Sequence, residues 1–173
     1  MTLVLHSLGR LALCGLLLTA VVAPAPPRAF AQVTPPPQCE QGRIAFTRLE
    51  QGSGSEVFVM NADGSGQTAL TNSPANDAAP AFSPDGARIA FQSDRDNPVN
   101  TRPDIYVMNA NGGNVVRLTN AAAADDAPEW SPDGTKIAFT SARDDTSGLN
   151  HSELYVMNAD GSGQTRLTFG MSV

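Results

Sequence analysis

The chain has few residues that support reactive or metal-binding chemistry. Its 173 residues include two cysteines and two histidines. Only Cys39 and His151 remain once a predicted leader of 31 residues is set aside, so an internal disulfide, a histidine-based triad and a zinc site all lack a second member. Cys39 is then either an inert thiol or one half of an intermolecular disulfide. The Gly-x-Ser-x-Gly nucleophile elbow is also absent. We therefore predict no catalytic residue, no metal site and no cofactor.

Basic residues are also scarce. Lysine and arginine total 11 against 17 acidic residues, and Lys136 is the one lysine. Nucleic acids and anionic membrane surfaces are recognised through basic patches, so both are poor partners for this chain. The acidic balance favours a basic protein or a small cationic ligand.

Long hydrophobic runs are absent after residue 23. Residues 11–23 form an apolar run of signal-peptide length, and Ala29-Phe30-Ala31 fits the small-x-small cleavage pattern. The run is too short for a membrane span, which needs about 20 residues. We predict a signal peptide over 1–31, a Pro-rich linker over 32–41, and no stable membrane insertion after cleavage. Loss of Arg10 and Arg28 would shift the net charge from −6 to −8.

What the chain does have is repetition. A Met-Asn-Ala-Asp/Asn-Gly block recurs at Met60, Met108 and Met157, in steps of 48 and 49 residues. An Ile-Ala-Phe run precedes each block, and a Leu-Thr pair follows it. All-strand units of about 40–50 residues predict propeller blades.

The second copy predicts four strands joined by hairpins. Ser83-Pro84-Asp85-Gly86 has the residues of a tight turn, and Asn109–Gly113 has those of another. The strands are apolar on both faces, as expected for a sheet packed between two others. Phe82 and Trp130 hold equivalent positions and are expected in the core between blades. The predicted fold is all-β, a partial β-propeller of four-stranded antiparallel meanders with an incomplete first blade, covering residues 42–173 as blades at about 42–71, 78–119 and 126–169.

These motifs resemble the TolB-like β-propeller repeat family, a periplasmic relative of the WD-type repeats. The carrying residues are Pro128–Gly134, Ile137-Ala138-Phe139, Leu154–Gly161 and Arg166-Leu167-Thr168. The resemblance covers about residues 42–169 and implies a periplasmic or secreted protein. The same repeats occur in TolB and in the propeller domains of prolyl-oligopeptidase-like peptidases, so the resemblance leaves the role open.

Three blades cannot close a ring of the usual four to eight. Two chains could form a six-bladed homodimer, the chain could be an incomplete gene product, or it could persist as an open arc.

The long connections between strands are expected to share one rim, which we call the long-loop rim, and the short turns to share the opposite turn rim. The long connections carry eleven acidic and four basic residues, nearly all of the net charge. Asp94-Arg95-Asp96 and Arg143-Asp144-Asp145 are expected at equivalent positions, either as salt-bridge clusters or with a ligand-contacting arginine. The candidate binding residues are Asp77, Asp94, Arg95, Asp96, Asp125, Asp126, Arg143, Asp144 and Asp145.

Three functions remain open from the sequence. The chain could be a non-catalytic exported binding scaffold, the propeller portion of a larger enzyme such as a peptidase, or a remnant without independent activity. The scaffold is the favoured hypothesis, with the long-loop rim as its contact surface.

Overall fold

The structure is a computed structural model that describes residues 42–50, 54–97, 102–146 and 151–170. The predicted signal peptide, the linker and Cys39 lie outside these residues. In the described segments every regular element is a strand, so the all-β prediction is confirmed.

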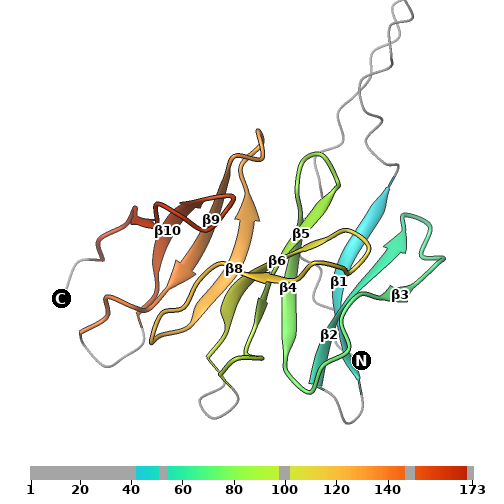
Figure 1. Ribbon diagram of the computed structural model, residues 1–173, viewed down its shortest axis with the longest axis horizontal. Coiled ribbons are helices and arrows are strands. Elements are labelled where there is room, and N and C mark those ends of the chain that lie inside the picture. The colour runs from blue at the N-terminus through green and yellow to red at the C-terminus, as the bar shows by residue number, and fades with distance from the viewer. Residues whose placement is uncertain (1–41, 51–53, 98–101, 147–150, 171–173) are drawn as a thin grey trace, which may run out of the picture.

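Eleven strands form three antiparallel sheets that lie side by side, from right to left in Figure 1. Blade 1 has three strands in the order β1-β2-β3, and blades 2 and 3 each have four in sequence order. The predicted partial propeller with an incomplete first blade is confirmed. The strands are β1 (Arg43–Glu50), β2 (Gly54–Asn61) and β3 (Thr68–Ala69) in blade 1; β4 (Asp77–Phe82), β5 (Arg88–Ser93), β6 (Asp104–Asn109) and β7 (Val116–Arg117) in blade 2; β8 (Asp125–Trp130), β9 (Lys136–Ser141), β10 (Glu153–Asn158) and β11 (Thr165–Arg166) in blade 3.

The short turns of each blade meet at one rim because successive hairpins alternate in direction. The amide of Ala110, in the second turn of blade 2, donates to the carbonyl of Ala87 in the first turn at 2.9 Å. Ala159 and Thr135 repeat this bond in blade 3 at 3.0 Å. The long connections are therefore at the opposite rim, as the sequence predicts.

The core consists of two layers, one at each junction between blades. Between blades 1 and 2, Ala45, Val57 and Val59 meet the larger Ile89, Phe91, Tyr106 and Met108. Between blades 2 and 3, Ala90, Ile105 and Val107 meet Ile137, Phe139, Tyr155 and Met157 in the same arrangement. At each junction the earlier blade thus contributes alanine and β-branched side chains, and the later blade contributes an isoleucine, a phenylalanine, a tyrosine and a methionine. Phe82 and Trp130 pack against these layers, as predicted.

A bulge in the first strand of blades 2 and 3 links each blade to the one before it. The pairing of β4 with β5 shifts register between Ala78 and Ala81, and Ala79 has a positive φ of 50°. Its amide donates to the Thr47 hydroxyl of blade 1 at 3.1 Å. Ala127, with φ of 52°, donates in the same way to Gln92 of blade 2 at 2.9 Å. The strained backbone therefore turns an amide of one blade toward its neighbour.

Candidate binding rim

An aspartate anchors the long-loop rim of each four-stranded blade. It lies at the start of the first strand, β4 in blade 2 and β8 in blade 3, which we call the inner strand. In blade 2 the carboxylate of Asp77 is fully buried and receives the Arg95 guanidinium at 2.9 Å. The same guanidinium bonds Ser93 and lies over the ring of Tyr106, 5.1 Å from its centroid. The ring and the carboxylate together hold the arginine in place.

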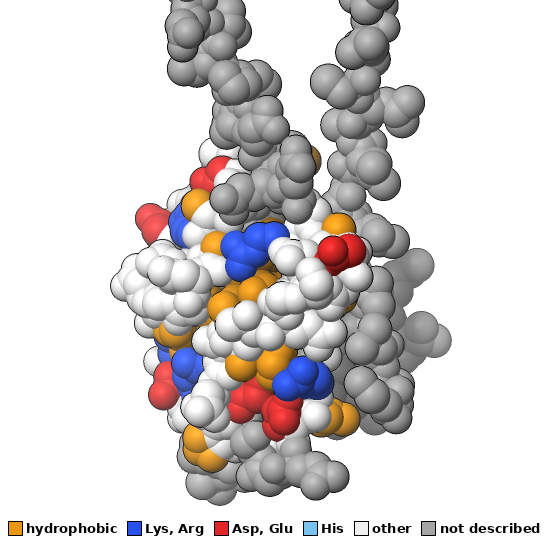
Figure 2. Space-filling view, turned by 90° about the vertical axis from the view of Figure 1, so that its right-hand side faces the viewer, with side chains coloured by type: hydrophobic (Ala, Val, Ile, Leu, Met, Phe, Trp, Pro, Cys, Tyr) orange, Lys and Arg blue, Asp and Glu red, His pale blue; other side chains and the backbone are white. Residues whose placement is uncertain are grey.

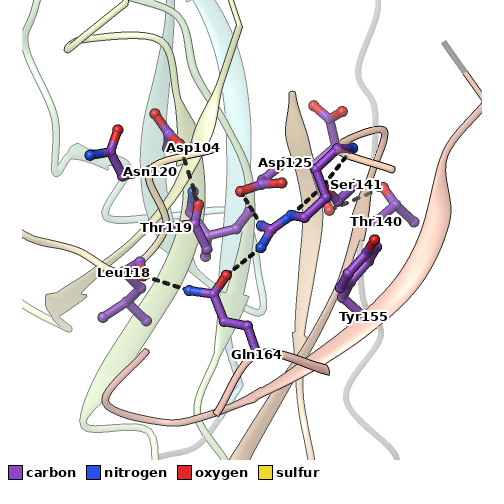
Figure 3. Close-up of polar contacts among 12 residues, drawn as sticks. Asp104, Leu118, Thr119, Asn120, Asp125, Thr140, Ser141, Tyr155 and Gln164 are labelled. Atoms are coloured by element: carbon purple, nitrogen blue, oxygen red, sulfur yellow. Dashed lines mark hydrogen bonds and ion pairs between the residues drawn. The ribbon is translucent and has the colours of Figure 1, made fainter. Parts of the chain in front are cut away.

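Blade 3 repeats this arrangement. Arg143 donates to the buried Asp125 at 2.8 Å and lies 4.9 Å from the centroid of the Tyr155 ring. Figure 3 shows Asp125, Ser141 and Gln164 converging on this guanidinium. Within the described segments, one oxygen of Asp125 and one of Asp77 in blade 2 are buried without a hydrogen-bond partner.

A second acidic residue, within β2 of blade 1 and at the start of the third strand of blades 2 and 3, holds the connection that leaves each blade. In blade 1 Glu56 accepts a hydrogen bond from the Thr71 hydroxyl at 2.6 Å, and that hydroxyl accepts the amide of Val57 at 2.9 Å. Asp104 with Thr119 and Glu153 with Thr168 repeat the contact in the other blades. The threonine of the repeated Leu-Thr pair is thus explained by this contact with an acid.

Burial changes the proton affinities of this network. Desolvation raises the pKa of Asp104, and the nearby Asp125 charge of the next blade adds to it, against the lowering effect of Arg117. Desolvation and the hydrogen bond from the Tyr155 hydroxyl to Asp144 raise the pKa of Tyr155 to about 12. The Tyr155 hydroxyl therefore stays protonated as a donor at neutral pH.

A hollow of about 230 Å³ opens on the same rim at the junction of blades 2 and 3. Asp94 reaches it from the end of β5 and Asp126 from β8. The carboxylate of Asp94 is buried and accepts two bonds from Asn76, at 2.8 and 3.0 Å. The hollow is lined by Asn76, Ala78, Gln92, Asp94, Pro103 and Asp126.

Asp126 differs from the other acids of the hollow and network. Among the described residues its carboxylate has no hydrogen-bond or ion-pair partner, and it is half-buried. Desolvation, with a smaller contribution from Asp125, raises its pKa. A cation in the hollow would relieve both effects.

The pair of acids in the hollow is not part of the repeat. The residue equivalent to Asp126 in blade 2 is Ala78, and the residue equivalent to Asp94 in blade 3 is Ala142. Asp77 and Asp125, in contrast, occur at the same position in both blades. The repeated acids therefore form the ion pairs that stabilise each blade, whereas Asp94 and Asp126 face the same hollow at one junction only.

The structure divides the candidate binding residues into three groups, with Asp145 apart from them. Asp77, Arg95, Asp125 and Arg143 form ion pairs within their blades. Asp96 and Asp144 are half-exposed, accept from Tyr106 and Tyr155, and lie 3.7 Å from Arg117 and Arg166. Asp94 and Asp126 line the hollow, and Asp145 accepts the amide of His151 at 3.3 Å.

One alignment made from the sequence is wrong. Because Arg95 and Arg143 each follow a bonded serine by two residues, Arg143 is the counterpart of Arg95 and Asp144 that of Asp96. The two charged triplets are therefore offset by one position. Sequence reasoning also missed Asn76 and Gln92, which carry no charge, and the spacing of 18 residues within both Asp–Arg pairs was the signal for those pairs.

Metal and membrane sites receive no support from the described part of the chain. There, no three His, Cys, Asp or Glu side chains are grouped as metal ligands. Nor does that part contain a helix with the length and apolarity needed to cross a bilayer.

Comparison with known proteins identifies the repeats. Residues 97–173 match the family model of the TolB β-propeller domain. A putative TolB from Agrobacterium tumefaciens superposes with a TM-score of 0.62 at 26% identity, covering 72% of this chain and 44% of that one. TolB from Acinetobacter baumannii gives a TM-score of 0.57 at 26% identity, over 73% of this chain and 30% of that one.

A curated relative points to another protein class. Dipeptidyl-peptidase 5 from Porphyromonas gingivalis is 50% identical over 38 residues, which are 22% of this chain and 6% of the peptidase. The chain thus spans less than half the length of each of these three relatives. The resemblance to TolB-like β-propeller repeats is confirmed by the family model over residues 97–173 and by the similarity of the fold to the two TolB structures.

Proposed function

We propose that the chain is a non-catalytic, exported TolB-like scaffold that binds a basic partner or a small cationic ligand at the hollow between Asp94 and Asp126. The observation that carries the proposal is the placement of these two acids. The equivalent positions of the other four-stranded blade have no acid. Both acids line one hollow, and Asp126 has no partner among the described side chains.

A cationic ligand matches the chemistry of the hollow. Asn76 and Gln92 add amide groups beside the two carboxylates, and Pro103 and Ala78 add apolar surface. An ammonium or guanidinium group on an aliphatic stem would meet both kinds of lining. The raised pKa of Asp126 is a cost that such a ligand offsets on binding.

Calorimetric titration tests the proposal. A lysine- and arginine-rich peptide, and calcium in a separate run, are titrated into the intact chain and into Asp126→Ala. That substitution reproduces the native Ala78 of the equivalent strand, so the fold should tolerate it. We expect peptide binding that weakens about tenfold in Asp126→Ala, as for loss of one charge-assisted contact.

Asp63→Asn is the matched control. It removes one negative charge from an exposed residue of the turn rim, and the equivalent turn in blade 2 has Asn111. Binding should not change in this variant. Equal weakening in both variants would mean a general charge effect, and no heat from either titrant would refute the proposal.

Export has a test of its own. N-terminal sequencing of protein recovered from the periplasm or medium should begin at Gln32, and an uncleaved cytoplasmic chain would contradict export.

A peptidase-associated propeller is the second candidate, favoured by the local identity to dipeptidyl-peptidase 5. The chain contains no nucleophile elbow, so a fluorophosphonate serine-hydrolase probe should not label it. Recovery of the chain joined to, or in complex with, a serine hydrolase that the probe does label would favour the peptidase alternative over the scaffold.

A further inference from the structure

Blade 1 differs from the other blades at its inner edge. In blades 2 and 3 the inner strand pairs with β5 or β9, whereas β1, their counterpart, pairs only with β2 in the described structure. One edge of this eight-residue strand therefore has no partner strand there. Figure 2 shows the blade 1 end of the molecule, where hydrophobic side chains gather with basic side chains beside them.

The arginine site of the complete blades is nevertheless present in blade 1. The Arg48 guanidinium lies 3.7 Å from the centroid of the Phe58 ring, at the position of Tyr155 in blade 3. Arg48 also contacts Gln67 at 3.4 Å, as Arg143 contacts Gln164. The Arg48 guanidinium thus contacts the equivalent ring and the equivalent glutamine, although Arg48 comes from a different position in the repeat than Arg143.

Its carboxylate partner is different. In the complete blades the arginine binds an aspartate of the inner strand that has no exposed surface. In blade 1 Arg48 instead binds Glu50, two residues along its own strand, and the two side chains are 35% and 38% exposed. Glu50 therefore occupies the place that an inner-strand aspartate has elsewhere, in an exposed pair that contributes little stability.

The register defines which strand would fit. Asp77 lies opposite Ser93 and Asp125 opposite Ser141, and the equivalent position of β1 is Arg48. At the other end of β4 and β8, the last two residues of Pro-x-aromatic pair with residues of β5 and β9 that are equivalent to Ile44 and Ala45 of β1. A strand with the pattern Asp-x-x-Pro-x-aromatic would put its aspartate beside Arg48 and its aromatic ring beside Ile44.

We propose that the open edge of β1, with Arg48, is a docking site for an extended segment of the Asp-x-x-Pro-x-aromatic type on a separate polypeptide. The segment adds antiparallel to β1, and its aspartate displaces Glu50 from the guanidinium. This chain has two such segments, Asp77–Phe82 and Asp125–Trp130, and both are paired within their own blades. Residues 32–37 precede β1 in the sequence by the same spacing, but they include neither an acidic nor an aromatic residue.

A labelled peptide with the sequence of residues 124–134 tests the proposal by fluorescence anisotropy against the intact chain. We expect saturable binding that weakens about tenfold with Arg48→Gln, the loss for one charge-assisted pair. Arg102→Gln is the control, since it removes a cation from a long connection on the same rim without touching β1. A peptide carrying Asp125→Asn leaves the protein unchanged and should also bind about tenfold more weakly.

The two changes should not add, because both remove the same pair. Equal binding of the two peptides, additive losses, or equal weakening by Arg102→Gln would overturn the proposal. So would self-association of the chain that excludes the peptide, because the occupant would then be a second copy, as in the six-bladed homodimer that the sequence left open. Asp126 is in another blade, so this test and the titration of the hollow can fail independently.

Discussion

The packing of a turn glycine against the preceding blade gives a sharp prediction. Gly64, Gly112 and Gly161 hold the same turn position in the three blades, with φ of 84°, 86° and 88°. A Cβ added at Gly112 would lie 2.8 Å from the Leu70 carbonyl oxygen, and one at Gly161 would lie 2.9 Å from that of Leu118. A Cβ at Gly64 would meet nothing within 4 Å.

These geometries separate two costs of an alanine substitution. Gly64→Ala has only the cost of a left-handed backbone, about 1–2 kcal/mol. Gly112→Ala adds an overlap with backbone atoms of blade 1, and overpacking typically costs about 1–3 kcal/mol more. Gly161→Ala should resemble Gly112→Ala because its contact with blade 2 is the same.

Urea unfolding followed by circular dichroism measures the difference. The free energy of unfolding should fall by about 1–3 kcal/mol more in Gly112→Ala than in Gly64→Ala, with similar slopes against urea. Trp130, the one tryptophan, lies at the junction of blades 2 and 3 and gives a second signal for Gly161→Ala. Equal losses in Gly64→Ala and Gly112→Ala would refute the stacking of turns against the preceding blade.

Three other substitutions follow from the polar network and the bulge. Arg143→Met leaves the fully buried Asp125 unpaired and should cost about 3–5 kcal/mol in urea unfolding, whereas adding Asp125→Leu should recover most of it; equal losses in the two proteins would contradict the ion pair. Asp126→Ala should raise the thermal midpoint at pH 7, because a pKa raised in the folded state means that ionisation of Asp126 opposes folding. The gain should shrink as the pH falls toward 3.8, the ordinary pKa of an aspartate, and a pH-independent gain would argue against it. Ala127→Gly should add about 0.5–1 kcal/mol to the free energy of unfolding, since glycine relieves the positive φ and keeps the amide bond to Gln92; a loss of stability would show that the backbone is not strained.

The repeat made the strands predictable from the sequence. Ile-Ala-Phe and Tyr-Val-Met are apolar on both faces, as a sheet between two others requires, and blade 2 lies in that position here. The turn residues between these runs limit the pairing to hairpins. The bulges at Ala79 and Ala127 were not predictable, since alanine is an unusual residue for a left-handed backbone. They form because the amide has a partner on the neighbouring blade.

The candidate site was only partly predictable. Charge counting located the acids on the long-loop rim, but it could not separate Asp77 and Asp125, which an arginine neutralises, from Asp126. Pairing between distant residues decides that difference, and no local pattern encodes it. The comparison of equivalent positions is what distinguishes Asp94 and Asp126, since the repeat itself does not contain them.

The most direct test of the stacked-blade arrangement is amide hydrogen exchange of Ala79 and Ala127, measured residue by residue by NMR. Both amides should exchange slowly, because each donates to a side chain of the preceding blade. Gly64→Ala should leave both protected, while Gln92→Ala should release Ala127 alone. Exchange of both amides at the rate of an unfolded chain would contradict the packing of the blades face to face.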